Sequence, residues 1–158
     1  AEGEAGTFKE DPMAMRPFFS YHEGDYSGHW LEVLGKLGDN APAFFHINWF
    51  RKSAKGKFLW PGYGENLRAL LWALDRVQGK GAGTETPAGT IPTAEALNLE
   101  GLELEPEALK TILSYEPDVW REEAQRRTEW LKKLGDRVPK KIQEIHQAFV
   151  SAAEAFQK

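Results

Sequence analysis

Between Asn48 and Asn66 the sequence gathers residues that could bind a flat, charged ligand. The rings in this stretch are Trp49, Phe50, Phe58, Trp60 and Tyr63, and the glycines are Gly56, Gly62 and Gly64. Aromatic faces stack on bases, and glycines let backbone N–H and C=O groups approach a ligand closely. The stretch ends where a helix is expected to begin, and the free N–H groups of a helix start attract anions. The stretch therefore predicts a pocket for a flat, polar anion, with a nucleotide as the first candidate.

The competing interpretation is a small aromatic core between two strands, because strands are rich in aromatic residues. Neighbours along a strand point to opposite faces, so both faces of a hairpin here carry large rings and one set can line a cleft. Tyr63 stands between two glycines, which presents its ring on a bare backbone. Asn66 follows with an amide that donates and accepts at once, as reading a purine edge requires. These details favour a pocket.

No residue pattern points to catalysis by this chain. The histidines His22, His29, His46 and His146 share no helix face at i, i+4 and lie in no H-E-x-x-H setting, so we interpret them as structural or surface residues. No serine lies in a G-x-S-x-G motif, and no G-x-x-x-x-G-K-[ST] phosphate loop occurs. The absence of cysteine excludes disulfides and thiol chemistry. We expect neither a catalytic residue nor a metal ligand in the chain.

Length and composition predict one soluble domain. The chain has 158 residues, of which 41% are hydrophobic and 28% charged, enough for a single core. A net charge of -4 argues against nucleic-acid binding, and no apolar run approaches the ~20 residues of a membrane helix. The lack of cysteine and of a signal sequence favours the cytoplasm. The basic residues at 51–57 are interpreted as solvated hairpin charges, with steering of a triphosphate as a weaker alternative.

The predicted fold class is α+β, with short aromatic strands in the first half and a mostly helical second half. Residues 43–49 and 58–60 are expected to be strands, joined by a turn at 53–56 in which Gly56 adopts positive φ. Residues 1–12 form a flexible lead-in. Residues 79–93 are expected to be the longest loop, because they show no periodicity.

The spacing of apolar residues and the positions of proline and glycine predict the helices. They are expected near 26–37, 67–77, 106–114, 117–134 and 139–156. Asp25 is the expected cap of the first, and Pro106, Pro117 and Pro139 the first residues of the last three. The last helix is expected to bury a narrow seam made of Val138, Ile142, Ile145, Phe149, Ala152 and Phe156.

Several segments together carry a family resemblance. They are residues 11–19, 28–31, 46–52, 56–66, 91–92 and 95–99. This set resembles the C-terminal part of GTP-dependent phosphoenolpyruvate carboxykinase, whereas the last sixty or so residues are similar mainly in being helical. The resemblance implies a decarboxylating lyase of gluconeogenesis that converts oxaloacetate and GTP to phosphoenolpyruvate, GDP and CO2 with Mn²⁺ and Mg²⁺.

For this segment the resemblance implies a guanine nucleotide site. Phe50, Phe58 and Tyr63 would enclose the base, Asn66 would contact its edge, and the backbone from Tyr63 through Gly64 and Glu65 to Asn66 would add hydrogen bonds. The family more usually has phenylalanine at position 63, and tyrosine keeps the stacking face. Ser20, His22 and Glu23 depart from the family's usual glycine and asparagine–aromatic pair.

The resemblance also implies that the chain is incomplete as an enzyme. The phosphate loop, the metal ligands and the catalytic residues would lie upstream, with Ala1 and Glu2 as the tail of a mobile lid. Residues 13–158 would be the C-terminal segment of a larger mixed α/β nucleotide-binding domain, inactive alone. Its partners would be the upstream portion of the same polypeptide and small-molecule substrates, with no nucleic acid and no membrane, in a monomeric parent enzyme.

Two alternatives have no enzymatic role. The first is a single-stranded nucleic-acid module that uses the aromatic, basic hairpin as a stacking platform, which predicts strongly salt-dependent oligonucleotide binding. The second is a purely structural domain whose aromatic cluster is core. Full burial of Phe50, Phe58 and Tyr63 would favour the second.

Overall fold

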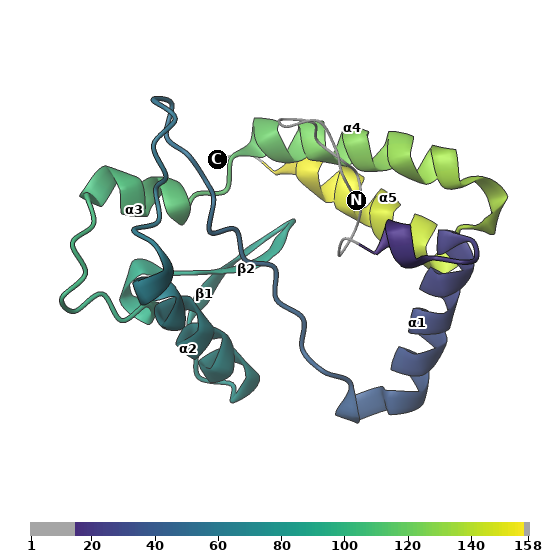
Figure 1. The fold of residues 1–158 in the computed structure, drawn as a ribbon, viewed down its shortest axis with the longest axis horizontal. Helices are drawn as coiled ribbons and strands as arrows, with labels where there is room; N and C mark the ends of the chain where they lie inside the picture. The colour runs from purple at the N-terminus through teal and green to yellow at the C-terminus, as the bar shows by residue number, and fades with distance from the viewer. Residues whose placement is uncertain (1–14, 157–158) are drawn as a thin grey trace. The chain divides into compact units, whose positions relative to one another are not determined.

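A computed structural model of the chain describes residues 15–156, which fall into two compact units (Figure 1). Of the described residues, unit 1 contains 15–41 and 117–156, and unit 2 is Pro42–Glu116. The expected lead-in over residues 1–12, including the lid tail at Ala1 and Glu2, lies outside the described residues. No helix in the described part of the chain is long and apolar enough to cross a membrane.

Unit 1 is built from helices. They are α1 (Glu23–Leu37), α4 (Pro117–Leu134) and α5 (Lys140–Ala155), with 3-10 turns at Arg16–Phe18, Gly38–Asn40 and Gly135–Arg137. The helices α4 and α5 pack side by side and bury Ala124 and Ala153, with Val138 buried just before α5 begins (Figure 1). All three helices were predicted, because prolines and glycines mark their ends.

The start of α1 differs from the prediction. His22, and not Asp25, caps α1, because its Nδ1 accepts a hydrogen bond from the Gly24 N–H at 3.0 Å. Asp25 lies in the first turn, where a carboxylate suits the helix dipole, and forms an ion pair with Arg137. The helix therefore begins three residues earlier than expected.

The buried face of α5 also differs from the expected seam. Ile145 is 52% exposed, whereas Ala153 is fully buried and His146 is half-buried. The expected seam repeats every 3.5 residues, but a straight α-helix has 3.6 residues per turn and drifts away from such a repeat. Along α5 the buried stripe therefore moves from Ile142 to His146 and then to Ala153.

Unit 2 has two helices and a small sheet. The helices are α2 (Asn66–Val77) and α3 (Pro106–Ile112), and the strands β1 (Gly83–Thr86) and β2 (Gly89–Pro92) pair antiparallel with Gly83 opposite Pro92. Short 3-10 turns lie at Tyr63–Glu65 and Ala94–Ala96. The predicted helix over 67–77 is confirmed, with Gly79 at φ 74° just beyond its end.

The β-structure of unit 2 is in a different place from the prediction. Residues 79–93, expected to be a loop, contain the β1–β2 hairpin, with Gly89 at φ 109° where the second strand begins. The expected strand at 43–49 is wrong: residues 41–48 are irregular, and Phe44 and Phe45 are exposed. A strand needs a paired neighbour as well as β-favouring side chains. The α+β class is confirmed as a helix-rich chain with one small antiparallel sheet.

Candidate functional site

A tight turn brings the two halves of the 48–66 stretch together. The Ser53 N–H donates to the Lys57 carbonyl at 2.8 Å, the Gly56 N–H donates to the Ser53 carbonyl at 2.9 Å, and Gly56 has φ 76°. The predicted turn is confirmed, but the expected second strand at 58–60 is reduced to a single antiparallel bridge between Lys52 and Phe58. Beside this bridge the Leu59 N–H donates to the Arg51 carbonyl at 2.9 Å, which holds the two halves together.

The hairpin carries two pairs of rings in contact. Trp49 and Trp60 lie with their ring centroids 5.8 Å apart and tilted by 44°. Phe50 and Phe58 lie 6.1 Å apart in an edge-to-face arrangement at 65°. Two separate ring pairs therefore lie on this hairpin. Phe58 and Trp60 are two residues apart, a spacing that a regular strand places on one face, so strand alternation does not account for the two pairs.

The two ring pairs differ in burial. Trp60 is only 8% exposed, whereas Phe50 is 72% exposed and Phe58 52% exposed. Lys52 places its Nζ 5.0 Å from the centre of the Phe58 ring, a cation–π distance. The two phenylalanines therefore form an uncovered aromatic platform with a positive charge beside it, which suits stacking of a flat anionic ligand.

Arg51 anchors the hairpin to the rest of unit 2. Its guanidinium donates to the Ile112 carbonyl at 3.2 Å and to the Ser114 hydroxyl at 3.2 Å, and it forms an ion pair with Glu116. The prediction that all the basic residues here are solvated is therefore wrong for Arg51, which has partners more than sixty residues away in the sequence. Lys52, Lys55 and Lys57 are exposed, as predicted.

Tyr63, Gly64 and Glu65 form the 3-10 turn that leads into α2. Tyr63 is 91% exposed, and the ring contacts within residues 15–156 do not include it. Gly62 precedes the turn with φ 132°, a conformation that favours glycine. The structure thus brings Phe50 and Phe58 together and leaves the Tyr63 ring free on the surface.

Asn66, the first residue of α2, connects the start of the helix to the hairpin. Its Oδ1 accepts a hydrogen bond from the Trp60 indole Nε1 at 2.9 Å. The oxygen of this amide is therefore occupied, and its NH2 group is the half that can donate to a ligand. Sequence reasoning singled out both residues but gave no sign that they are bonded.

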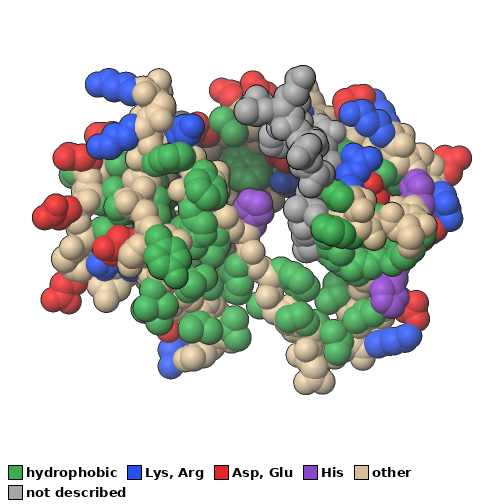
Figure 2. All heavy atoms as spheres, viewed as in Figure 1, with side chains coloured by type: hydrophobic (Ala, Val, Ile, Leu, Met, Phe, Trp, Pro, Cys, Tyr) green, Lys and Arg blue, Asp and Glu red, His purple; other side chains and the backbone are tan. Residues whose placement is uncertain are grey.

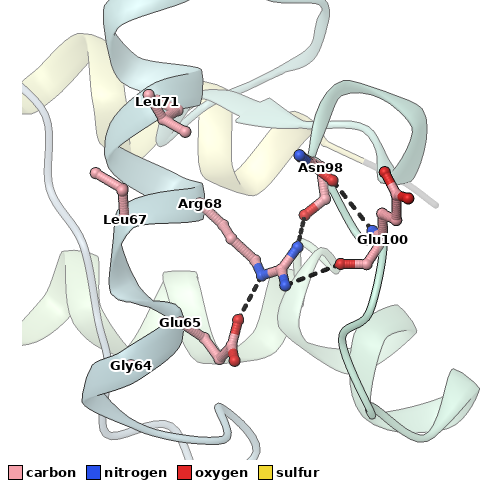
Figure 3. Close-up of a pocket in the computed structure, with 7 residues that line it drawn as sticks. All are labelled: Gly64, Glu65, Leu67, Arg68, Leu71, Asn98 and Glu100. Carbon is pink, nitrogen blue, oxygen red and sulfur yellow. Dashed lines mark hydrogen bonds and ion pairs between the residues drawn. The ribbon is translucent and has the colours of Figure 1, made fainter.

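Arg68 is a site residue that sequence reasoning missed. Its Nε donates to Glu65 Oε2 at 2.5 Å, and its two terminal nitrogens donate to the carbonyls of Asn98 and Glu100 (Figure 3). It borders an open pocket of about 300 Å³ lined by Gly64, Glu65, Leu67, Arg68, Leu71, Asn98 and Glu100. The spacing of Glu65 and Arg68, three apart at a helix start, is the signal that could have revealed it.

The groups with displaced pKa values lie away from these residues. Burial and the nearby Arg127 guanidinium lower the pKa of His146, whose Nε2 lies 2.8 Å from the Thr128 hydroxyl. A backbone hydrogen bond, and then one from Thr93, lower the pKa of Glu95. Within residues 15–156, no three histidine, aspartate or glutamate side chains are grouped so that they could hold a metal ion.

The histidines have structural or surface positions, as predicted. His22 caps α1 and His146 bonds to Thr128 between α4 and α5. His29 and His46 are exposed. The residues brought together around the hairpin can stack, donate and accept hydrogen bonds, and attract an anion. That is the chemistry of a binding site.

Comparison with known proteins gives a consistent family. Residues 1–152 match a family model described as the C-terminal P-loop domain of phosphoenolpyruvate carboxykinase. A relative from Renibacterium salmoninarum, named phosphoenolpyruvate carboxykinase [GTP], is 43% identical over 144 residues, 90% of this chain and 24% of the relative. A protein of the same name from Corynebacterium efficiens is 40% identical over 157 residues, 99% of this chain and 26% of the relative. The chain thus spans about a quarter of the length of these curated relatives.

Proposed function

The chain belongs to the family of GTP-dependent phosphoenolpyruvate carboxykinases, and from this we propose that it forms the guanine nucleotide site of such an enzyme. The complete enzyme would convert oxaloacetate and GTP to phosphoenolpyruvate, GDP and CO2, a decarboxylating lyase reaction of gluconeogenesis. The segment would supply recognition of the base. The relatives' names state a GTP dependence, which supports a guanine rather than an adenine ligand.

The observation that carries this proposal is the exposed platform of Phe50 and Phe58 beside a tryptophan pair in which Trp60 is buried. Guanine would stack on the platform, since aromatic faces stack on bases. The Tyr63 ring, free on the surface, would close on the other side of the base. The backbone of Gly64 and Glu65 and the side-chain amide of Asn66 would take up the polar edge.

Neither alternative function has comparable support. A purely structural aromatic core requires the rings to be buried, but Phe50, Phe58 and Tyr63 are all more than half exposed. A single-stranded nucleic-acid platform would need a basic face, and the chain has a net charge of -4. Strongly salt-dependent binding of an oligonucleotide would favour that second alternative.

The partner we propose is the upstream portion of the same polypeptide. Hydrophobic side chains gather on the surface of α2 (Figure 2), where five apolar residues are exposed: Leu67, Leu70, Leu71, Leu74 and Val77. Contiguous apolar surface of this kind marks an interaction site. The relatives are about four times as long as the matched segment, so they hold enough further chain to cover it.

That upstream portion would also hold the reaction chemistry. We place there the phosphate loop, the catalytic residues and the ligands for Mn²⁺ and Mg²⁺, ions that would neutralise phosphate charge during transfer. Residues 13–158 would then be the C-terminal segment of a larger mixed α/β nucleotide-binding domain in a cytoplasmic, monomeric enzyme. The chain alone would show no turnover of oxaloacetate.

Tryptophan fluorescence of a complete carboxykinase polypeptide that carries this segment tests the proposal. Trp49 and Trp60 lie in the same hairpin as Phe50 and Phe58. GTP and GDP are expected to quench the emission at concentrations at which ATP and ADP do not. Equal competition by ATP would show that the site does not recognise guanine.

A further inference from the structure

We propose that Trp60 is a positioning residue that sets the base preference of this site. Its indole N–H holds the Asn66 amide in one orientation, so that the NH2 group faces the ligand and selects a 6-oxopurine over a 6-aminopurine. The inference rests on the proposed guanine site.

The orientation follows from the donor chemistry of the indole. An indole nitrogen can donate a hydrogen bond but cannot accept one. Trp60 Nε1 lies 2.9 Å from the side-chain oxygen of Asn66. If the amide were rotated by half a turn, its NH2 group would face the indole N–H, donor against donor. One orientation of the Asn66 amide is therefore strongly preferred, whereas an isolated asparagine has no such preference.

Packing keeps the indole in place. Trp60 is 8% exposed and lies against the Trp49 ring at 5.8 Å. The first turn of α2 is held independently, because Arg68, two residues after Asn66, bonds to the carbonyls of Asn98 and Glu100. The Asn66 amide and the turn that carries it are thus each held by contacts within unit 2.

A fixed outward NH2 group distinguishes the two purines. Guanine carries an acceptor, the 6-oxo group, where adenine carries a donor, the 6-amino group. An asparagine that is free to turn can satisfy adenine by accepting from the 6-amino group and donating to N7. An asparagine whose oxygen is turned toward the indole presents its NH2 group to the base, so it pairs with the 6-oxo group of guanine and opposes the 6-amino group of adenine. The indole N–H is the atom that makes this difference.

Replacing Trp60 with phenylalanine removes this N–H and keeps an aromatic ring. The chain offers a matched control in Trp72, which lies on α2 six residues after Asn66 and is also 8% exposed, but whose Nε1 donates to the Ala82 carbonyl at 2.8 Å and not to Asn66. Trp60→Phe and Trp72→Phe each delete one buried indole hydrogen bond. Only the first frees the Asn66 amide.

The measurement is calorimetric titration of the complete carboxykinase polypeptide with GDP, IDP and ADP, which does not depend on tryptophan emission. IDP has the 6-oxo group of guanine but lacks its 2-amino group. In Trp60→Phe the Kd ratios ADP/GDP and ADP/IDP are each expected to fall by about 3- to 10-fold, the scale of one hydrogen bond. In Trp72→Phe both ratios are expected to stay within about twofold of wild type.

The outcomes separate this inference from the proposed function. If wild type itself shows no preference for GDP over ADP, the guanine site is wrong. If wild type prefers GDP but Trp60→Phe weakens all three nucleotides equally, Trp60 only supports the fold and the inference is overturned.

Asn66→Asp decides the question should Trp60→Phe fail to fold. It keeps an acceptor for the indole but presents a second oxygen to the base in place of NH2. The ADP/GDP ratio is then expected to fall by about tenfold or more, and an unchanged ratio overturns the inference.

Discussion

The two ring pairs of the hairpin share one turn and one bridge, yet they have different surroundings. Trp49 and Trp60 pack within unit 2, and the Trp60 N–H finds a partner in Asn66. Phe50 and Phe58 meet edge to face and remain open to solvent. Within a few residues the hairpin therefore carries one ring pair that supports the fold and one that is open to a ligand. The burial of each pair, rather than the type of aromatic residue, indicates whether it supports the fold or can bind a ligand.

The largest effect is expected from truncating the tryptophan pair. Trp60→Ala would leave a cavity and an unpaired Asn66 oxygen, and we expect it to lower the free energy of unfolding by about 3–5 kcal/mol. Phe50→Ala, the control in the exposed pair, would cost less than about 1 kcal/mol, because most of its ring is already in water. Urea unfolding of both variants measures the difference. Similar losses of unfolding free energy in the two variants would show that both ring pairs support the fold.

Truncating the exposed pair is expected to weaken ligand binding and to leave stability almost unchanged. Phe58→Ala would weaken GTP binding in the complete enzyme by about 1–3 kcal/mol, the scale of losing one stacking ring. Unfolding should change little, since Phe58 is 52% exposed. The KM for GTP and calorimetric titration with GDP check this expectation. An unchanged KM with reduced stability would assign Phe58 to the core and remove the distinction between the two ring pairs.

The parts of the fold that the sequence predicted well are those with local signals. Glycine just beyond α2 and the prolines at α3 and α4 mark helix ends, and Gly56 marks the hairpin turn. The strand expected at 43–49 failed because β-favouring side chains do not supply a pairing partner. The β1–β2 hairpin was missed for the opposite reason: its glycines and threonines show no apolar alternation, and backbone pairing alone defines it.

The candidate site divides in the same way. The meeting of Phe50 with Phe58 follows from the tight turn between them, which the sequence indicates. The anchoring of Arg51 at Ser114 and of Arg68 at Asn98 and Glu100 depends on partners thirty to sixty-three residues away, which a single sequence cannot indicate. Their roles are visible only once the chain is folded.

The departure at His22 and Glu23 has a structural explanation. His22 accepts the Gly24 N–H and so fills the capping role that asparagine often has. Glu23 forms an ion pair with Arg16 at 2.7 Å. Both substitutions act on the start of α1, within unit 1. We therefore expect them to affect helix stability rather than the choice of nucleotide.

The smallest effect that we expect is a change in how stability depends on pH. It tests whether this dependence arises in the helical unit 1 and not at the ring pairs. The pKa of His146 is lowered from 6.5 by burial and by Arg127. The unfolded chain then binds a proton more readily than the native one, so stability is full above pH 6.5 and falls as the pH drops toward the folded pKa. His146→Gln keeps a polar partner for Thr128 but cannot titrate, and should flatten the fall in urea midpoint over this range. His29→Gln, an exposed control on α1, should leave the fall unchanged. A fall that persists in His146→Gln would place the titrating group elsewhere in the chain.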